Sequence, residues 1–226
     1  MKLLIAGIGP GNPELITLSA MKAAEQADII IIPRSKIDTS GLAEKIIMHH
    51  LPDKKYLPLL FPMTRDAEHR DALILSQLID AKDEWENVST IFFPVIGDSM
   101  LYSTGKYLLT AFHELIPDLE AEFIPGISAH SLAASCAKKF LAMNDEILAI
   151  IPGTADSEHI RKILASCDCA AIYKPTAITD PQELLRGFNA IRVDYAGIPE
   201  LEHITYEEEA ITGLHDYLSI ILLWRD

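Results

Sequence analysis

The first residues whose types could do chemistry form a glycine-rich loop, GIGPG, from Gly7 to Gly11. The loop follows an apolar run at Leu3–Ala6 and precedes a helical pattern, a layout that binds nucleotide phosphates through backbone N–H groups. Two details argue against phosphate: no Gly-Lys-Ser/Thr ending follows, and Asn12 stands where the dinucleotide fingerprint needs its third glycine. Pro10 also removes a backbone N–H. The loop therefore predicts either a tight strand–helix turn or a place where a large ligand approaches a strand end.

Two further segments combine glycine or proline with small polar residues directly after a predicted buried strand. They are VIGDSMLYST at Val95–Thr104 and IPGISA at Ile124–Ala129. In open α/β sheets, ligands bind beyond the carboxyl ends of the strands. Each segment alone fits an ordinary turn. Together with the first loop, they predict a shared ligand site built from strand ends.

Other reactive residues form no convincing site. His49 and His50 are adjacent on a predicted helix and therefore point apart, and the other histidines lack ligand spacing. Cys167 and Cys169 are too close for a usual zinc site, and no second pair exists. We predict no metal site, and we expect these two cysteines and Cys136 to be reduced and mostly in the core.

The elements that position the three segments are predicted from apolar runs and helical periodicity, which alternate without hairpin turns and so indicate parallel βα units. Strands are expected at residues 2–6, 28–32, 55–59, 90–95, 122–124, 146–151, 169–173 and 190–196. Helices are expected at about 13–26, 42–49, 66–80, 103–115, 129–138, 159–164 and 181–187. Two extended segments, 204–211 and 217–224, are expected to pair antiparallel around Gly213. The periodicity breaks near residue 116, which predicts two α/β domains, 1–116 and 117–226.

Composition restricts the class of protein. With 226 residues and 49% hydrophobic residues, the chain is expected to be globular. No apolar run reaches the roughly 18 residues that span a bilayer, and the first strand follows Met1 and Lys2 without a signal peptide, so we expect a cytoplasmic protein. A net charge of −14 disfavours nucleic acid and membrane partners. The acidic run Glu202–Ala210 predicts a solvated edge.

Three segments together resemble the signature blocks of the tetrapyrrole methylase family. They are GIGPGNPELITLSAMKAAEQADII, IGDSMLYSTGKYL and IPGISAHSLAASC, and they occur in the family's order along nearly the whole chain. The resemblance implies two α/β domains with a cleft between them, the fold of class III methyltransferases. It implies S-adenosylmethionine, bound in a folded conformation, as the methyl donor. It also implies a small-molecule tetrapyrrole substrate and a homodimer.

One branch of this family is more similar than the others. FPMTRDAEHRDAL, GDSMLYST, DEILAIIPGT and YLSIILLW resemble the C20-methyltransferases that act on precorrin-2 or cobalt-precorrin-2 in cobalamin biosynthesis. One departure is Ser99, where the family usually has proline after Gly-Asp, and we expect it to loosen the backbone after Asp98. Two alternatives stay open: a sibling methylase acting at another ring position, and a protein that binds S-adenosylmethionine without turnover. The sequence does not decide whether the substrate contains cobalt.

The resemblance also implies site residues. Residues expected at the cofactor are Pro10, Ile96, Gly97, Asp98, Leu101, Ser128, Ala129, Tyr173, Lys174, Gly197 and Leu218, with Tyr217 beside the last. Residues expected at the substrate are Gly9, Pro10, Arg34, Tyr102 and Ser103. Asp98 and Tyr102 are the expected catalytic side chains, with an ordinary packed tyrosine as the alternative for Tyr102.

The chemistry explains why these motifs lack a catalytic triad. A methyl group would pass from a sulfonium to a meso carbon of a reduced macrocycle, which is itself the nucleophile, so the protein supplies mainly proximity and alignment. Because an acidic macrocycle meets an acidic protein, local positive charge is needed. The candidates near predicted loops are Arg34, Lys36, Arg65 and Lys106, and Arg34 is the first choice.

Overall fold

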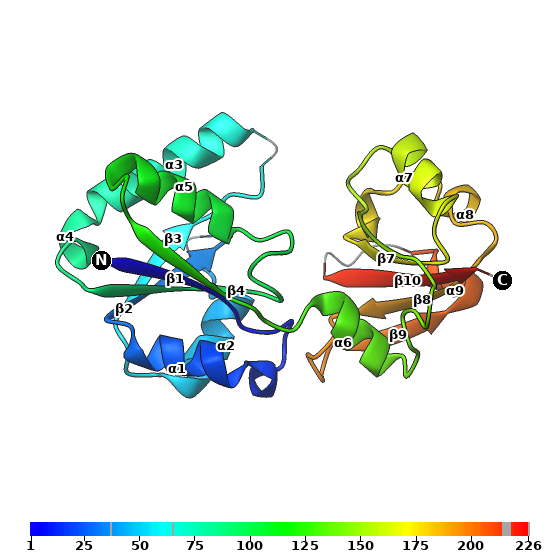
Figure 1. Cartoon of the computed structure of the whole chain (residues 1–226), viewed down its shortest axis with the longest axis horizontal. Coiled ribbons are helices and arrows are strands. Elements are labelled where there is room, and N and C mark those ends of the chain that lie inside the picture. Colours follow the sequence, from blue (N-terminus) through cyan, green and yellow to red (C-terminus); the bar gives the residue numbers. More distant parts are fainter. Residues whose placement is uncertain (37, 65, 214–217, 226) are drawn as a thin grey trace. The chain divides into compact units, whose positions relative to one another are not determined.

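The structure is a computed structural model that describes residues 1–36, 38–64, 66–213 and 218–225. The chain divides into two compact units, residues 1–128 and 129–226. Within the described residues, each unit contains one five-stranded sheet with helices packed on it (Figure 1). The expected α/β fold class is confirmed.

The first unit has a parallel sheet in the order β3-β2-β4-β1-β5. Its strands are β1 (Lys2–Gly7), β2 (Ile29–Arg34), β3 (Tyr56–Leu60), β4 (Thr90–Val95) and β5 (Glu120–Ile124). Its helices are the 3-10 helix η1 (Pro13–Leu15), α1 (Leu18–Gln26), α2 (Leu42–His50), α3 (Ala67–Asp80), α4 (Lys82–Trp85) and α5 (Gly105–Leu115). All the described strand pairs of this sheet are parallel, as expected when strands are joined by helices in βα units.

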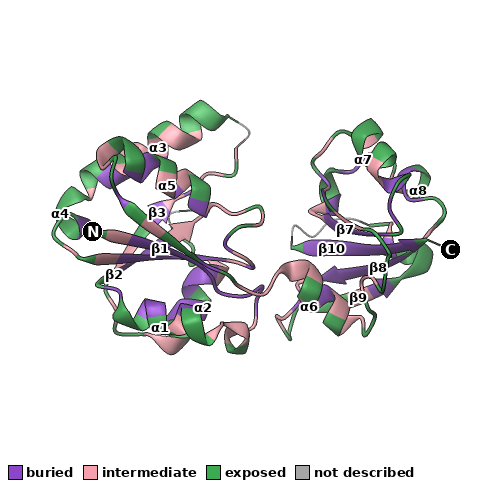
Figure 2. Ribbon diagram, viewed as in Figure 1, coloured by how far each residue is buried: buried purple, intermediate pink, exposed green. Residues whose placement is uncertain are grey.

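Both faces of this sheet are covered, which is why its strands read as continuous apolar runs. Leu3 and Ile5 of β1 pack in a core with α3 and α5, whereas Leu4 and Ala6 pack in a second core with α1 and α2. Figure 2 shows that the buried residues concentrate along the strands. The central strands are thereby fixed, and the loops at their carboxyl ends start from rigid positions.

The first helix begins later than the sequence predicts. Asn12 caps only the short η1, accepting a hydrogen bond from the Glu14 N–H at 2.9 Å. The α-helix starts at Leu18, because Thr17 adopts an extended conformation and its hydroxyl accepts from the Ala20 N–H at 3.1 Å. The Asn-Pro pair therefore marks a separate turn that precedes the helix.

The division between the units also differs from the predicted one at residue 116. β5 pairs in parallel with β1, from Lys2 opposite Glu120 to Ala6 opposite Ile124. This strand therefore belongs to the first sheet, and the first compact unit extends to Ser128. A break in apolar periodicity marked the connection before β5, where the chain leaves α5.

The second unit has a mixed sheet in the order β6-β7-β10-β8-β9. Its strands are β6 (Leu148–Pro152), β7 (Cys169–Tyr173), β8 (Phe188–Asp194), β9 (His203–Tyr206) and β10 (Ser219–Arg225). Its helices are α6 (Ala129–Cys136), α7 (Ser157–Leu164), the 3-10 helix η2 (Pro175–Ala177), α8 (Pro181–Leu184) and α9 (Glu207–Ala210). Helices α7, α8 and α9 contribute to the core on one face, and α6 contributes to the core on the other.

The predicted antiparallel pair around Gly213 is wrong. β10 lies between β7 and β8 and is antiparallel to both, whereas β9 pairs with β8. Residues 207–210 form α9 and do not extend the strand. Tyr217, at the start of the predicted second segment, lies outside the described residues.

The structure also describes the cysteines, the apolar character of the helices and the grouping of metal-binding residue types. All three cysteines carry free thiols. In the described ranges, no helix combines the length and the apolar character needed to cross a bilayer. The same ranges contain no group of three or more His, Cys, Asp or Glu residues placed to hold a metal ion.

Candidate functional site

The loops after β1, β4 and β5 meet at the carboxyl edge of the first sheet, where β1 lies between the other two strands. Gly9 and Gly97 exchange two backbone hydrogen bonds, of 3.3 and 2.9 Å, and both have φ near +80°. A Cβ on Gly7 would lie 2.5 Å from the Gly97 carbonyl oxygen, and one on Gly126 would lie 2.3 Å from it. The three glycine segments singled out in the sequence are therefore packed backbone on backbone.

Asp98 joins two of these loops. Its Oδ1 accepts from the Met100 N–H and its Oδ2 from the Gly126 N–H, each at 2.9 Å. Hydrogen bonds to a carboxylate are stronger than neutral ones, so this side chain fixes the loop after β4 against the loop after β5. Each oxygen retains a second lone pair with which it can accept from a ligand.

Tyr102 has a left-handed backbone, with φ of 51°, and its side chain is 47% exposed. Partial burial raises the pKa of the Tyr102 phenol, which therefore stays protonated at neutral pH. A left-handed bulky residue costs about 1–2 kcal/mol, and such strain concentrates at ligand sites. The next residue, Ser103, accepts the Gly105 N–H at 3.0 Å and so supports the start of α5.

Ser99, the departure from the family's proline, is 2% exposed. Among the described residues its Oγ has no hydrogen-bond partner. A buried hydroxyl without a partner costs about 1–3 kcal/mol. The substitution thus places an uncompensated polar group directly after Asp98.

The remaining candidates of the first unit vary in exposure. Gly9 and Pro10 are buried, whereas Ile96 and Leu101 are half-buried. Ile96 also packs against the core formed with α1 and α2. Ser128 is half-buried and ends the unit.

Arg34 forms an ion pair inside the protein. Its Nε lies 2.9 Å from Glu44 Oε2 and its Nη2 lies 2.5 Å from Glu44 Oε1. Glu44 lies on α2 and is 7% exposed, and the hydrogen bond to it raises the pKa of Arg34. Lys36 and Lys106 are exposed, and Arg65 lies outside the described residues. The positive charge of Arg34, the first candidate for contacting a substrate carboxylate, is therefore offset by the carboxylate of Glu44.

In the second unit, the carboxyl ends of β7 and β8 lie beside the first residues of β10. Lys174 and Tyr195 follow these two strands and both have left-handed backbones, with φ of 53° and 51°. The Lys174 N–H donates to the Ser219 carbonyl at 3.3 Å, and the Tyr195 N–H donates to the Leu218 carbonyl at 2.8 Å. Two of the predicted cofactor residues, Lys174 and Leu218, are thus brought to one edge.

Two residues of this edge, Gly153 and Tyr195, were not predicted from the sequence. A Cβ on Gly153 would lie 2.7 Å from the Lys174 carbonyl oxygen, so this position also requires glycine. The signal was present in the sequence, because Pro152 and Gly153 follow a strand as Pro125 and Gly126 do. Tyr195 gave no such signal, since only the structure shows its left-handed conformation.

Gly197 and the start of α6 are held by side chains. Gly197 has φ of 82°, and its N–H donates to Glu202 Oε2 at 2.8 Å. The Tyr173 hydroxyl lies 2.7 Å from His130 Nδ1 and accepts the His130 N–H at 3.3 Å. Tyr173 thereby fixes the first turn of α6, which begins at Ala129.

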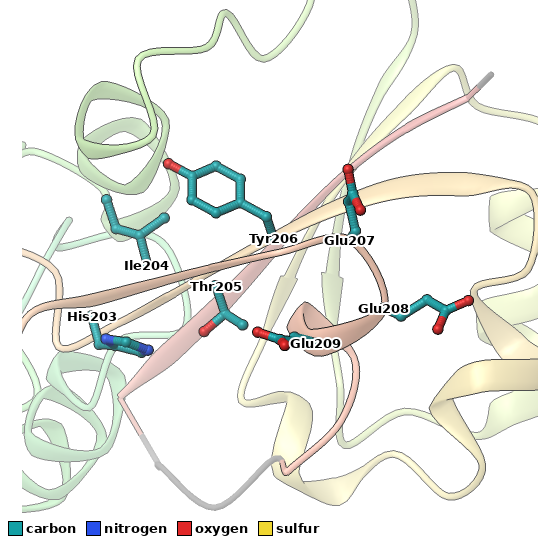
Figure 3. Close-up of a pocket in the computed structure, with 7 residues that line it drawn as sticks. All are labelled: His203, Ile204, Thr205, Tyr206, Glu207, Glu208 and Glu209. Atoms are coloured by element: carbon teal, nitrogen blue, oxygen red, sulfur yellow. The ribbon is translucent and has the colours of Figure 1, made fainter.

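A hollow of about 610 Å³ lies along β9 and α9 (Figure 3). It is lined by His203, Ile204, Thr205, Tyr206, Glu207, Glu208 and Glu209. None of the predicted site residues lines it. The three glutamates are exposed, as expected of a solvated acidic edge.

Residues 2–213 match the sequence profile of the Tetrapyrrole (Corrin/Porphyrin) Methylases. The chain belongs to this family. This chain is 29% identical to a precorrin-2 C(20)-methyltransferase of Sinorhizobium sp. The alignment covers 100% of this chain and 96% of that protein. The chain is also 29% identical to a probable cobalt-precorrin-2 C(20)-methyltransferase of Methanocaldococcus jannaschii, covering 99% and 96%.

Solved structures share the fold of this tetrapyrrole methylase. A uroporphyrin-III C-methyltransferase of Thermus thermophilus, complexed with S-adenosylhomocysteine, aligns with a TM-score of 0.67 at 20% identity. The alignment covers 99% of this chain and 96% of that one. The family confirms the predicted enzyme class, a methyltransferase that uses S-adenosylmethionine.

The residues at the carboxyl edge of the first sheet fit such a cofactor chemically. Its sulfonium is a cation, and the loop after β4 offers the carboxylate oxygens of Asp98. The close-packed glycines Gly7 and Gly126 leave backbone atoms, not side-chain bulk, at this edge. When bound, the cofactor supplies an activated methyl group, and the chain needs only to hold and align the reactants.

Proposed function

We propose that this chain methylates C20 of precorrin-2 or cobalt-precorrin-2 during corrin formation. The observation that carries the proposal is the similarity to two relatives with these names along essentially the full length of both chains. The four branch-specific segments quoted above support the same assignment. Identity of 29% leaves the ring position as the part to be tested.

Roles for the site residues are part of this proposal. In the first unit, Gly97, Asp98 and Leu101 would contact the cofactor, with Asp98 also fixing the loop through Gly126. In the second unit, the cofactor-binding residues would be those proposed from the sequence. They are Ala129, Tyr173, Lys174, Gly197 and Leu218. Tyr102, protonated and half exposed, would orient the macrocycle by donating a hydrogen bond.

Arg34 is kept as the proposed contact for a substrate carboxylate, with Glu44 holding its guanidinium in one orientation. Arg34→Ala should then raise the KM for the macrocycle while the KM for S-adenosylmethionine stays unchanged. Because Arg34→Ala also leaves Glu44 buried without its partner, the double variant Arg34→Ala/Glu44→Ala is the matched control. A macrocycle KM within twofold of wild type in both variants would remove Arg34 from the substrate site.

The second candidate is a sibling methylase acting at another ring position. The solved structure from Thermus thermophilus shares the fold, and its name refers to a different macrocycle, so fold alone does not fix the substrate. A protein that binds the cofactor without turnover is the remaining alternative. The Ser99 hydroxyl, which has no hydrogen-bond partner among the described residues, is the feature that would accompany such a loss.

The deciding experiment is anaerobic incubation with S-adenosylmethionine and precorrin-2, with and without cobalt, followed by mass spectrometry and carbon NMR of the macrocycle. We expect the gain of one methyl group, located at C20, on one of the two forms. Methylation at another carbon would support the sibling enzyme. Cofactor binding without any mass change would support the non-catalytic alternative. The proposed homodimer is tested separately by sedimentation of the same preparation.

A further inference from the structure

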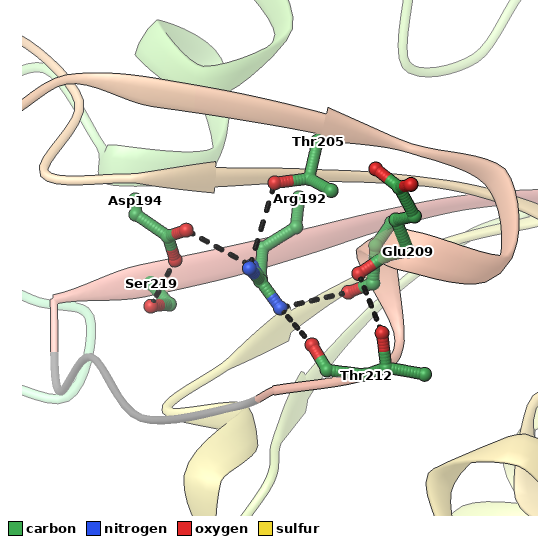
Figure 4. Close-up of polar contacts among 7 residues, drawn as sticks. Arg192, Asp194, Thr205, Glu209, Thr212 and Ser219 are labelled. Atoms are coloured by element: carbon green, nitrogen blue, oxygen red, sulfur yellow. Dashed lines mark hydrogen bonds and ion pairs between the residues drawn. The ribbon is translucent and has the colours of Figure 1, made fainter.

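A buried arginine connects several elements of the second unit (Figure 4). Arg192 lies on β8 and is 9% exposed. Its Nε donates to Asp194 Oδ2 at 2.9 Å, and its Nη1 donates to the Thr212 carbonyl at 2.5 Å. Longer contacts of 3.5 Å reach the Ala210 carbonyl and the Thr205 hydroxyl. One guanidinium thus joins β8, β9 and the end of α9.

Asp194 extends this network to β10. Its Oδ1 accepts the Ser219 hydroxyl at 2.5 Å, while its Oδ2 accepts from Arg192. Asp194 is 3% exposed and Ser219 is 4% exposed. A buried ion pair of this kind contributes little net stability, because desolvation offsets the attraction, and its best-supported use is to select one geometry.

The geometry selected here is that of the sheet edge with the proposed cofactor residues. Ser219 is the first residue of β10 and lies opposite Asp194 in the antiparallel register. Its carbonyl accepts from Lys174, and the preceding carbonyl, that of Leu218, accepts from Tyr195. Both donors are left-handed residues, a conformation that persists only where the surroundings determine it. The side-chain contact from Asp194 to Ser219 adds a third tie to the same short stretch.

We infer that Arg192, Asp194 and Ser219 form a positioning unit that sets the backbone of Leu218 and Tyr195 for binding the cofactor. The three are not among the residues proposed to contact the cofactor, and their effect passes through the edge residues. The inference rests on the proposed assignment of Lys174, Gly197 and Leu218 to the cofactor.

The opposite end of β10 provides a comparison within the same strand. Arg225 donates to the carbonyls of Cys167 and Leu164, which ties the carboxyl end of β10 to the segment between α7 and β7. It is also an arginine tie on this strand, but it lies at the edge away from Leu218. Its loss should affect stability without changing the cofactor edge.

The test measures S-adenosylhomocysteine binding to the full-length protein by calorimetry, together with the Tm of the ligand-free protein. Ser219→Ala removes one hydrogen bond, and Asp194→Asn replaces the carboxylate with an amide of the same shape. Each should raise the Kd about fivefold or more, the scale of one lost hydrogen bond. Arg192→Lys should restore part of the affinity lost in Arg192→Met, because lysine keeps the charge but not the fork.

Arg225→Met is the matched control, and it should lower the Tm while the Kd stays within twofold of wild type. A Kd within twofold for Ser219→Ala, with a Tm loss like that of Arg225→Met, would show a merely structural network. If Asp194→Asn fails to fold, the result for Ser219→Ala alone decides the test. If the wild type binds no S-adenosylhomocysteine, the positioning inference fails. If it binds but leaves precorrin-2 unchanged, only the proposed substrate fails.

Discussion

At the scale of single residues, the first sheet edge depends on positions where no side chain fits. Gly126→Ala would place a Cβ 2.3 Å from the Gly97 carbonyl oxygen and 2.6 Å from the Gly7 carbonyl carbon. Both neighbours are backbone atoms and cannot rotate away, so the loops must separate. We expect a loss of about 1–3 kcal/mol in the free energy of unfolding and a strong loss of methyl transfer. Urea denaturation and the methylation assay measure the two effects.

Gly41→Ala is the control for this prediction. Gly41 precedes α2, has a negative φ, and its added Cβ would meet one atom, the Pro33 carbonyl oxygen, at 3.3 Å. Because alanine is a poorer N-cap than glycine, stability should fall by up to about 1 kcal/mol, with no loss of methyl transfer. Equal losses in both variants would show that the close approach at Gly126 is not what requires glycine.

Two buried serines allow a matched prediction. Ser99 has no partner for its hydroxyl among the described residues, whereas the Ser219 hydroxyl donates to Asp194. Ser99→Ala should therefore keep or raise the free energy of unfolding, by up to about 1 kcal/mol, because it removes a buried polar group. Ser219→Ala should lower it by about 1 kcal/mol. Thermal denaturation of both variants provides the comparison, and destabilisation by Ser99→Ala would contradict it.

The sequence singled out the glycine-rich loops but not the groups that pack around them, which are the backbone of the neighbouring loops and several side chains. GIGPG and IPGIS follow buried strands, and this local pattern predicts a ligand site at the strand ends, which stays a prediction. That Asp98 accepts the Gly126 N–H, or that Glu44 pairs with Arg34, depends on elements distant in the chain. Propensity and periodicity contain no information about such contacts.

At the scale of elements, strands with continuous apolar runs were predicted within a few residues. β2 and β4 are examples, since burial on both faces makes their buried positions apolar. β5 has a weaker pattern, with exposed and half-buried residues before Ile124, and its sheet could not be assigned from sequence. The strand order of the second sheet could not be predicted from the sequence either, because β10 pairs with strands that are distant in the chain.

Helix α7 gives a prediction at this scale. Its N-cap, Asp156, accepts from the Glu158 N–H at 3.0 Å and the His159 N–H at 3.2 Å. The helix buries Ile160 and Leu164 in the core of the second unit, so fraying of its first turn reaches that core. Asp156→Ala should cost about 1 kcal/mol of stability.

The half-buried neighbour Ser157 supplies the control for the cap. Its hydroxyl makes only a 3.4 Å contact with Thr179, and Ser157→Ala should stay within about 0.5 kcal/mol of wild type. Chemical denaturation of both variants measures the difference. Equal effects would mean that the Asp156 side chain does not cap the helix.

At the scale of the whole molecule, each unit has its own sheet and its own cores on both faces of that sheet. An independent core is what allows a segment to fold alone. The position of β5 then makes the boundary testable, because the sequence placed the division at 116 and the contacts place it after Ser128.

A fragment of residues 1–128 should therefore unfold cooperatively in urea, whereas a fragment of residues 1–116 should not. The shorter fragment lacks β5 and so exposes one edge of β1. It also loses the ion pairs of Lys2 with Glu120 and Glu122, and the hydrogen bond from Gly126 to Asp98. Circular dichroism during denaturation compares the two. Cooperative unfolding of 1–116 with the stability of 1–128 would show that β5 is an addition to the first sheet, not a part of the unit that folds.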